Sequence, residues 1–548
     1  MSMSKYNIAS HLPAMAAAQP QTPAVIMQSD AAEPPCYSYQ QLDEVSDTLA
    51  RGLQEAGIGK GTRTVLMVTP GLEFFALVFA LFKIGAVMVA VDPGIGVKNL
   101  GQCLGEAEPE AFIGVPRAHI ARLLFGWAKQ SLKINIVVER ARLLGFFMRD
   151  LKQIEQAGRH SQAPTSNEVD AGDSAAILFT SGSTGVPKGV NYTHENFIAQ
   201  VEALRDLYDI KPGEVDLSTF PLFALFSPAL GMTSVIPLMD FTRPGEVNAA
   251  GIFDAVNRFS ATTMFGSPAL LDRVGKWGVE NGRKMPTMKR VISAGAPVSA
   301  AIIQRFSSFL ENDVEVFTPY GATEALPVAS IGSTEILSDT GRLSAEGKGV
   351  CVGRAVPGVS IQIIKISDDK LSDWDQVELV EQGEIGEITV QGRQVTASYY
   401  ERRESTELAK IKQDDGFYHR MGDLGYLDEQ GRLWFCGRKS ERVELEGQTL
   451  FTACCEGIFN AHSRVRRSAL VGIEEKGARL PLLCIELEAD SQHTDIEVLK
   501  QELMDLGSQH QQTAMIQRFL VHPGFPVDIR HNAKIGRPQL AEWAREQI

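Results

Sequence analysis

Residues 177–190 read ILFTSGSTGVPKGV, an apolar run that breaks into hydroxyl residues and glycines and then reaches a proline and one lysine. The apolar residues 175–179 predict a buried strand, and the residues after them predict a turn at its end. Glycines let the backbone approach a ligand closely, and backbone N–H and hydroxyl groups donate hydrogen bonds to phosphate oxygens. Lys188 adds a compact positive charge. The stretch therefore predicts a phosphate-binding loop.

A flexible solvent loop is the alternative for a run rich in glycine and serine, but the position directly after a buried strand disfavours it. The loop is not a P-loop, which needs Gly-Lys-Ser/Thr in succession at the start of a helix. Here Pro187 precedes the lysine, and KGVNYT (188–193) reads as a returning strand. GIGVKNLG (94–101) is misspaced for a dinucleotide fingerprint. The expected phosphate contacts are Thr180, Ser181, Gly182, Ser183, Thr184, Gly185 and Lys188.

The chain of 548 residues is too long for one hydrophobic core, so we expect a large domain and at least one smaller one. Its net charge of −14 disfavours a general nucleic-acid binder. The seven cysteines show no Cys-x-x-Cys spacing, which favours reduced thiols in a cytoplasmic protein over disulfides or a zinc site. Residues 1–15 lack the basic and apolar regions of a signal peptide.

The strongest apolar stretch of the sequence is residues 72–91. It contains Glu73 and Lys83, and Gly85 separates a helix-like half from a β-branched half. We therefore expect a buried helix followed by a buried strand rather than a membrane span.

Buried-strand patterns alternate with helical patterns through the first part of the chain, which indicates an α/β fold. Residues 195–208 have helical spacing, and Thr193 is the expected N-cap of that helix. The strands are expected at 63–68, 86–91, 175–179, 290–295 and 314–321.

The pattern changes after about residue 350. Short strands joined by glycine-rich turns predict a β-rich annex over about 350–439. From Ser440 onward, strand and helix patterns alternate again, enough for a small α+β domain. We therefore expect two domains, 1–439 and 440–548.

The stretch FTSGSTGVPKGV resembles the signature of the acyl-adenylate-forming (AMP-binding) superfamily, which includes acyl-CoA synthetases, peptide-synthetase adenylation domains and firefly luciferase. The resemblance extends over nearly the whole chain. It implies a large N-terminal AMP-binding domain of several subdomains, a mobile C-terminal lid, and ATP and Mg²⁺ as cofactors. The other matching stretches are SAGAPV (293–298), YGATE (320–324), HRMGDLGYLDEQGRLWFCGR (419–438) and RHNAKIGR (530–537).

The resemblance also implies roles for individual residues. Tyr320 would stack on adenine, Glu324 would bind the metal, and Thr184 and Glu324 would take part in catalysis. A carboxylate accepts two hydroxyl donors, which suits Asp423 to a ribose diol. The other nucleotide-binding residues implied are Gly295, Ala296, Pro297, Gly321, Thr323 and Arg438.

Each of these residues has a plainer interpretation in isolation. Tyr320 could be a core tyrosine, Glu324 a solvated residue after a turn, Asp423 a turn cap and Arg438 a surface cation. Only the ordered set of motifs favours the nucleotide site.

Lys534 would be the catalytic lysine that the lid delivers to the α-phosphate, where a cation offsets the repulsion between two anions. Two departures from the superfamily pattern accompany it. The hinge position, usually Asp or Lys, is Ser440, and the usual Ser-Gly before the lysine is Asn532-Ala533. A lysine near a C-terminus is otherwise an ordinary solvent-exposed residue.

The segment FPLFALFSPALG (220–231) lies where relatives form an acyl pocket, and Ala224 replaces a histidine found in many of them. With Phe223 and Phe226 it suggests an apolar acyl tunnel, and Met264 and Phe265 are further candidates for its wall. Ordinary core packing is the alternative for all of these side chains.

Three stretches closely resemble the β-lactone synthetases of bacterial long-chain olefin biosynthesis: 89–129, 452–472 and 527–544. That resemblance implies adenylation of a long-chain 2-alkyl-3-hydroxyalkanoic acid. The 3-hydroxyl then attacks the activated carbonyl and releases AMP. It also implies olefin-pathway enzymes as partners in a cytoplasmic assembly.

Two other functions stay open at this point. A long-chain acyl-CoA or acyl-carrier-protein ligase shares the nucleotide motifs, and the retained Gly447 leaves a thiol acceptor conceivable. A non-catalytic nucleotide-binding component is disfavoured because four charged residues are retained, namely Lys188, Glu324, Asp423 and Lys534. The sequence identifies no base for the 3-hydroxyl, and His194 at a helix start is expected to be structural.

Overall fold

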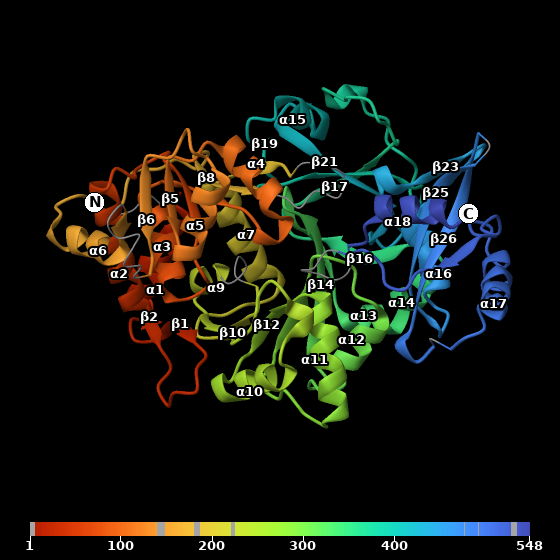
Figure 1. Ribbon diagram of the computed structural model, residues 1–548, viewed down its shortest axis with the longest axis horizontal. Coiled ribbons are helices and arrows are strands. Elements are labelled where there is room, and N and C mark those ends of the chain that lie inside the picture. Colours follow the sequence, from red (N-terminus) through yellow and green to blue (C-terminus); the bar gives the residue numbers. More distant parts are fainter. Residues whose placement is uncertain are drawn as a thin grey trace.

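The computed structural model describes residues 6–139, 148–179, 187–220, 225–475, 477–491, 493–527 and 534–548. Over these residues the strands form four sheets, of fourteen, eight, three and two strands (Figure 1). Helices lie between and outside the two large sheets. The predicted α/β class is confirmed.

The eight-stranded sheet carries the strand that leads into the predicted phosphate loop. Its central strands β8, β4, β3, β5 and β6 are parallel. Strand β9 is antiparallel to β8, in agreement with the prediction that residues 188–193 form a returning strand. In spatial order the strands are β19 (Ser398–Tyr399), β9 (Gly189–Thr193), β8 (Ser174–Phe179), β4 (Val87–Ala90), β3 (Arg63–Met67), β5 (Ala111–Gly114), β6 (Ile134–Val137) and β7 (Arg149–Asp150).

Helices cover both faces of this sheet, because successive strand residues point to opposite sides. Leu66 and Ile113 pack against α2 (Tyr39–Glu55), α3 (Leu72–Lys83) and α6 (Leu151–His160). Their neighbours Val65 and Phe112 pack on the other side against α4 (Val97–Ala107) and α5 (Pro116–Phe125).

The fourteen-stranded sheet joins the middle of the chain to the predicted β-rich annex without a break. Strands β11, β10, β12, β13 and β14 are parallel, and the strands beyond β14 are antiparallel. The spatial order is β17 (Ser360–Ile364), β18 (Gly386–Gln391), β21 (Gly416–Leu427), β22 (Leu433–Arg438), β16 (Val350–Ala355), β15 (Ala325–Ile331), β14 (Glu315–Ala322), β13 (Arg290–Ser293), β12 (Thr263–Gly266), β10 (Val215–Ser218), β11 (Thr233–Ile236), β1 (Pro23–Met27) and β2 (Cys36–Ser38), with β20 (Lys410–Gln413) on β21.

Residues after Val443 have hydrophobic cores of their own. One core lies between the three-stranded sheet and the helices α16 and α17, and a second lies between that sheet and α18. This arrangement is what a small C-terminal domain over 440–548 requires, although the boundary stays a prediction. The elements are β23 (Val443–Leu445), β24 (Gln448–Leu450), α16 (Thr452–Phe459), β25 (Val465–Glu475), β26 (Ala478–Leu487), α17 (Ile496–Ser508), β27 (Phe519–Val521) and α18 (Arg537–Glu546).

Two local predictions are confirmed. The apolar stretch 72–91 folds as α3 and β4. Thr193 caps α7 (His194–Leu207), because its hydroxyl accepts from the Asn196 N–H at 3.2 Å. Among the helices that the structure describes, none has the length and apolar character needed to cross a bilayer.

The crossing of α2 and α6 depends on two glycines. A Cβ at Gly158 would lie 1.9 Å from the Thr48 carbonyl oxygen, and one at Gly52 would lie 2.0 Å from that of Ile154. Backbone atoms cannot rotate away as a side chain can, so the helices would have to separate.

We predict that Gly158→Ala destabilises the protein by about 3 kcal/mol, the upper end of the usual range for overpacking. Gly105→Ala in α4 is the matched control, because a Cβ at Gly105 meets no atom within 4 Å. The control should keep or slightly raise the melting temperature, since alanine favours a helix over glycine. Differential scanning fluorimetry of both variants measures the difference, and equal melting temperatures would contradict the packing argument.

Candidate active site

The carboxyl ends of parallel strands from both large sheets border one cavity of about 2500 Å³. Its lining includes Asp92 after β4, Phe179 in β8, Thr219 after β10, Phe265 in β12 and Ser293 in β13. Ligands of open α/β sheets bind at this edge of the strands. The cavity is therefore the candidate active site.

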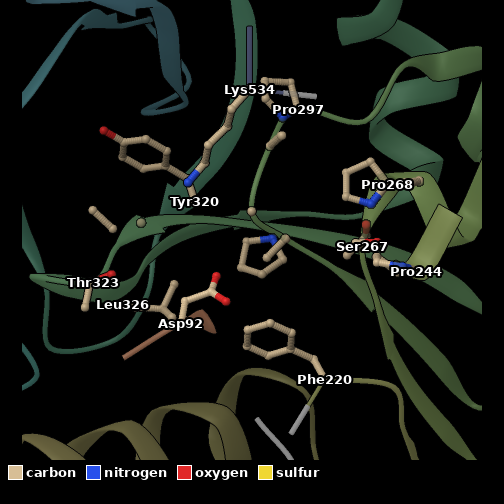
Figure 2. Close-up of a pocket in the computed structure, with 18 of the residues that line it drawn as sticks. Asp92, Phe220, Pro244, Ser267, Pro268, Pro297, Tyr320, Thr323, Leu326 and Lys534 are labelled. Atoms are coloured by element: carbon tan, nitrogen blue, oxygen red, sulfur yellow. The ribbon is translucent and has the colours of Figure 1, made fainter. Parts of the chain in front are cut away.

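Residues from distant parts of the chain face this space. In Figure 2, Asp92 and Phe220 lie on one side and the side chain of Lys534 enters from the other, in the direction of Tyr320. Part of the predicted site is outside the described residues, namely Thr180, Ser181, Gly182, Ser183, Thr184 and Gly185 of the phosphate loop and Phe223 and Ala224 of the acyl segment.

Lys188 and Glu324 are brought together by a residue that the sequence did not indicate. Tyr399 donates a hydrogen bond of 2.8 Å to Glu324 Oε1, and Lys188 Nζ lies 5.0 Å from the centre of the Tyr399 ring. Tyr399 reaches this position because β19 pairs with β9, with Tyr399 opposite Val190. The base of the predicted phosphate loop and the predicted metal ligand therefore share one aromatic side chain.

A second series of hydrogen bonds holds the main chain of Glu324. Its carbonyl oxygen accepts from Thr396 N at 2.9 Å and from Thr396 Oγ1 at 3.1 Å. The buried Lys410 in turn donates to the Thr396 carbonyl. Burial lowers the pKa of Lys410 to about 7. The turn that carries Glu324 is thus supported, through Thr396, by a lysine whose pKa lies near neutral pH.

Asp423, Tyr320 and Arg438 form the predicted ribose and adenine corner. The Tyr320 hydroxyl donates to Asp423 Oδ2 at 2.6 Å, and Arg438 Nη1 lies 2.8 Å from Oδ1. Arg438 reaches Asp423 because the two residues are opposite each other in the β21–β22 ladder. Burial raises the pKa of the Asp423 carboxyl, and the Arg438 charge opposes that rise.

Asp423 still has acceptor capacity toward a ligand. Its Oδ1 is buried and receives no hydrogen bond of good geometry, since Arg438 makes only an ion pair with it. A carboxylate oxygen has lone pairs for a further donor even beside an arginine. A ribose hydroxyl would meet that need, so the residues fit a nucleotide.

The remaining predicted nucleotide residues line the same cavity. Gly295 has φ +102°, a backbone conformation that favours glycine and turns the chain after β13. The Thr323 carbonyl accepts from the Tyr192 hydroxyl on β9, which attaches the β14–β15 turn to the first sheet. The lining also includes Ala296, Pro297 and Gly321.

Lys534, whose catalytic role stays a prediction, is among the residues that line the cavity, and Arg537, which the sequence did not indicate, anchors its segment. Arg537 Nη1 contacts Glu456 Oε1 of α16 at 2.5 Å, and its Nε contacts Glu441 Oε2 at 2.8 Å. Glu441 directly follows the predicted hinge residue Ser440. The lysine segment is therefore tied to one side of the predicted hinge.

The other side of the hinge is tied to the annex. Lys439 Nζ lies 3.2 Å from Glu387 Oε2 in β18 and donates to the Ser367 carbonyl at 2.8 Å. Ser440 itself is exposed and lies in the short 3₁₀ turn Lys439–Glu441. A pivot at Ser440 would leave these two anchors intact, but it would have to break the ion pair of 2.7 Å between Arg442, beyond the predicted hinge, and Asp368 of the annex.

The acyl wall differs from the sequence prediction at Met264. Phe226 and Phe265 line the cavity, but Met264 packs in the core formed with α10 (Ala249–Phe259) and α11 (Pro268–Glu280). Adjacent residues of a strand point to opposite faces, so β12 presents only Phe265 to the site.

Two apolar limbs of the cavity were not predicted. One follows α3, where Phe74, Val78, Phe79 and Phe82 recur at helical spacing, and it reaches Phe197. The other lies beneath α4 and α5 and is lined by Val97, Leu100, Ala118, Ala121 and Trp127. A helical apolar stripe is typical of core packing, so the sequence offered no signal that these side chains face a cavity.

His194 is structural, as expected. It is fully buried, accepts a hydrogen bond from Ile8 N at 3.3 Å, and is not among the residues that line the cavity. Burial lowers its pKa to about 4, so the ring is neutral at physiological pH.

The chain matches a known family and has relatives of full length. A model of the AMP-binding enzyme family matches residues 12–400. A protein of Stenotrophomonas maltophilia (strain K279a) named olefin beta-lactone synthetase is 48% identical over 554 residues, which cover 99% of this chain and 98% of the relative. A protein of the same name from Xanthomonas campestris pv. campestris is 47% identical over 553 residues, which cover 99% and 98%.

The fold is shared with solved structures at low sequence identity. The crystal structure of ATP-bound MatB from Rhodopseudomonas palustris has a TM-score of 0.77 at 20% identity, over 99% of each chain. The sequence motifs, the arrangement of Asp423, Tyr320 and Arg438, and the full-length relatives all indicate the same family. The chain therefore belongs to the AMP-binding family of adenylate-forming enzymes, together with the olefin beta-lactone synthetases that it resembles over nearly its whole length.

Proposed function

We propose that this enzyme uses ATP to convert a long-chain 2-alkyl-3-hydroxyalkanoic acid into a β-lactone, with release of pyrophosphate and AMP. The observation that carries the proposal is the 48% identity to an olefin beta-lactone synthetase over 99% of the chain. The geometry of the cavity supports both the nucleotide and the acid.

In the first step, a carboxylate oxygen of the acid attacks the α-phosphorus of ATP, and the bond to pyrophosphate breaks. Asp423 and Arg438 hold the ribose, Tyr320 lies along the adenine, and Lys188 with residues 180–185 contacts the phosphates. Lys534 places a positive charge at the forming bond, where two anions meet. Arg537 holds the segment that carries Lys534 through Glu456 and Glu441.

Mg²⁺ fits the carboxylate of Glu324, which lines the cavity and keeps its orientation through Tyr399. Over the described residues, there is no cluster of three or more acidic, histidine or cysteine side chains that could hold a metal. A Mg²⁺ ion that takes most of its ligands from phosphate oxygens and water needs few protein ligands. When bound, it would neutralise phosphate charge.

In the second step, the 3-hydroxyl oxygen bonds to the activated carbonyl carbon, and the bond between that carbon and AMP breaks. The hydroxyl proton is released and AMP departs with the bonding electron pair. The site contributes chiefly by confining the chain, because the reaction becomes unimolecular once the hydroxyl lies against the carbonyl. The four-membered ring closes only because AMP is a good leaving group.

The two apolar limbs support an acid with two alkyl chains. One limb runs along α3 toward Phe197, and the other runs beneath α4 and α5 toward Trp127. Each is lined by buried or half-buried apolar side chains, which favour hydrocarbon over water. We assign one alkyl chain of the substrate to each limb.

The small C-terminal domain over 440–548 would pivot at Ser440 between the two steps. The anchors of Lys439 on the annex and of Glu441 on Arg537 would persist on their own sides during the movement. We also infer a cytoplasmic enzyme that works with other olefin-pathway enzymes, as the named relatives suggest.

The product distinguishes the proposed function from a ligase that uses coenzyme A. With ATP, Mg²⁺ and a long-chain 2-alkyl-3-hydroxy acid but no thiol, mass spectrometry should detect the β-lactone, and chelation with EDTA should stop the reaction. The matching acid without the 3-hydroxyl should release pyrophosphate without forming lactone. Thioester formed only after addition of coenzyme A or acyl-carrier protein, with no lactone at any stage, would reject the proposal.

We predict that Lys534→Ala lowers acid-dependent pyrophosphate release by about 100-fold or more, because the charge at the forming bond is lost. ATP binding, measured by calorimetry, should stay close to that of the parent. Lys500→Ala is the matched control, since Lys500 lies on α17 in an ion pair with Glu497. Pyrophosphate release at the parent rate by the Lys534 variant would refute the assignment.

Asp423→Asn should lower kcat/KM for ATP by about 10- to 100-fold, because hydrogen bonds to a charged group contribute about 1.5–3 kcal/mol. The preference for ATP over 3′-deoxy-ATP should shrink at the same time, since the lost acceptor serves the ribose hydroxyl. Asp415→Asn in the exposed β20–β21 turn is the control. An unchanged preference in the Asp423 variant would place the ribose elsewhere.

A further inference from the structure

Helix α5 is amphipathic in the opposite sense to an ordinary surface helix. Its inward face carries His119, which is fully buried with Nε2 2.9 Å from the Ile136 carbonyl, and Arg122, which lies 5.6 Å from the centre of the Phe112 ring. Its outward face carries Ile120, Leu123 and Leu124 at helical spacing. A soluble surface helix normally places polar residues outward.

The outward side chains are strongly exposed. Leu124 is 76% exposed, Leu123 57%, Phe125 56% and Ile120 50%. No other helix in the described part of the chain has more than one large apolar side chain so exposed. Gly126 ends the helix in a left-handed conformation, and a Cβ there would meet no atom within 4 Å. These four side chains therefore form an apolar tip that projects from the surface, which we call the α5 tip.

The surroundings of the α5 tip are basic although the protein as a whole is acidic. Between Ala111 and Val138 the sequence has four arginines and lysines and no aspartate or glutamate, in a chain of net charge −14, although Glu110 and Glu139 flank this stretch and Glu110 Oε2 lies 3.8 Å from Lys133 Nζ. Three of these cations, Arg117, Lys129 and Lys133, are exposed. Such a combination of projecting apolar side chains and cations complements an anionic lipid surface.

The α5 tip is also continuous with the substrate cavity. Ala118 and Ala121, on the same helix, line the apolar limb beneath α5, and so does Trp127, whose ring stacks on Phe125 at 5.7 Å. An alkyl chain that leaves a bilayer at the α5 tip would therefore meet the apolar limb next. The exposed cations beside the tip, which fit anionic headgroups, favour lipid as the occupant.

We propose that the α5 tip docks this enzyme on anionic membranes, with Ile120, Leu123, Leu124 and Phe125 inserted among the lipids and the nearby lysines on their headgroups. This surface is separate from the adenylation site, and docking does not require that the proposed lactone product is correct. It would place the apolar limb where long-chain acids partition.

Vesicle flotation of the full chain tests the proposal. The parent should float with vesicles of phosphatidylcholine and phosphatidylglycerol, should float much less with phosphatidylcholine alone, and should be released by high salt. The double variant Leu124→Glu/Phe125→Glu and the double variant Lys129→Glu/Lys133→Glu should each lower the partition coefficient by about 10-fold or more, which corresponds to about 1.4 kcal/mol. Val498→Glu, at an exposed apolar residue of α17, is the matched control and should float like the parent.

Melting temperature and adenylation of a short, water-soluble acid should be unchanged in both double variants, which separates docking from folding and catalysis. Failure of the parent to float with anionic vesicles would overturn the proposal. So would flotation of the variants equal to that of the parent. Light scattering adds a third outcome: an oligomer of the parent that the Leu124/Phe125 variant dissociates, without lipid binding, would make the α5 tip a contact between copies and would also overturn it.

Discussion

The pairing of β19 with β9 is the interaction on which the site depends. It attaches a two-residue strand of the annex to the strand that follows the predicted phosphate loop, with Tyr399 opposite Val190. Tyr399 then contacts both Lys188 and Glu324. The Tyr192 hydroxyl on β9, which donates to the Thr323 carbonyl, is a second link between the eight-stranded sheet and the turn that carries Glu324. The main-chain hydrogen bonds of a short strand therefore hold together the phosphate side and the predicted metal side of the cavity.

Buried charges organise the rest of the site in pairs. Asp423 lies against Arg438, Arg537 lies against Glu441 and Glu456, and Lys439 lies against Glu387. An unpaired charge in a buried position is strongly unfavourable, so each pair constrains the elements that supply its members. The pairs on the two sides of Ser440 belong to different parts of the chain. The predicted hinge at Ser440 would leave these pairs intact, whereas the pair of Arg442 with Asp368 crosses it.

The apolar side of the cavity connects the chemistry to the surface of the protein. The lining residues of α3 are buried, whereas those of α5, Ala118 and Ala121, lie on the helix that carries the exposed Ile120, Leu123, Leu124 and Phe125. An enzyme whose substrate is nearly insoluble in water benefits from a path that keeps hydrocarbon away from water. The same physical constraint explains the lining of the cavity and the reversed polarity of α5.

The sequence by itself determined the α/β class, the strand before the predicted phosphate loop and the cap at Thr193, and it grouped Tyr320, Asp423 and Lys534, which the structure places on one cavity. Local patterns were sufficient for these because periodicity, turn residues and ordered motifs are properties of neighbouring residues. Contacts between distant segments were decided only by the tertiary structure. They include Tyr399 on Glu324, Arg537 on Glu441 and the α3 limb, for which the sequence shows only an ordinary tyrosine, an ordinary arginine and a core-like stripe. Met264 shows the same limit, since a sequence pattern places two adjacent residues in one strand but the sheet decides which of them faces the cavity.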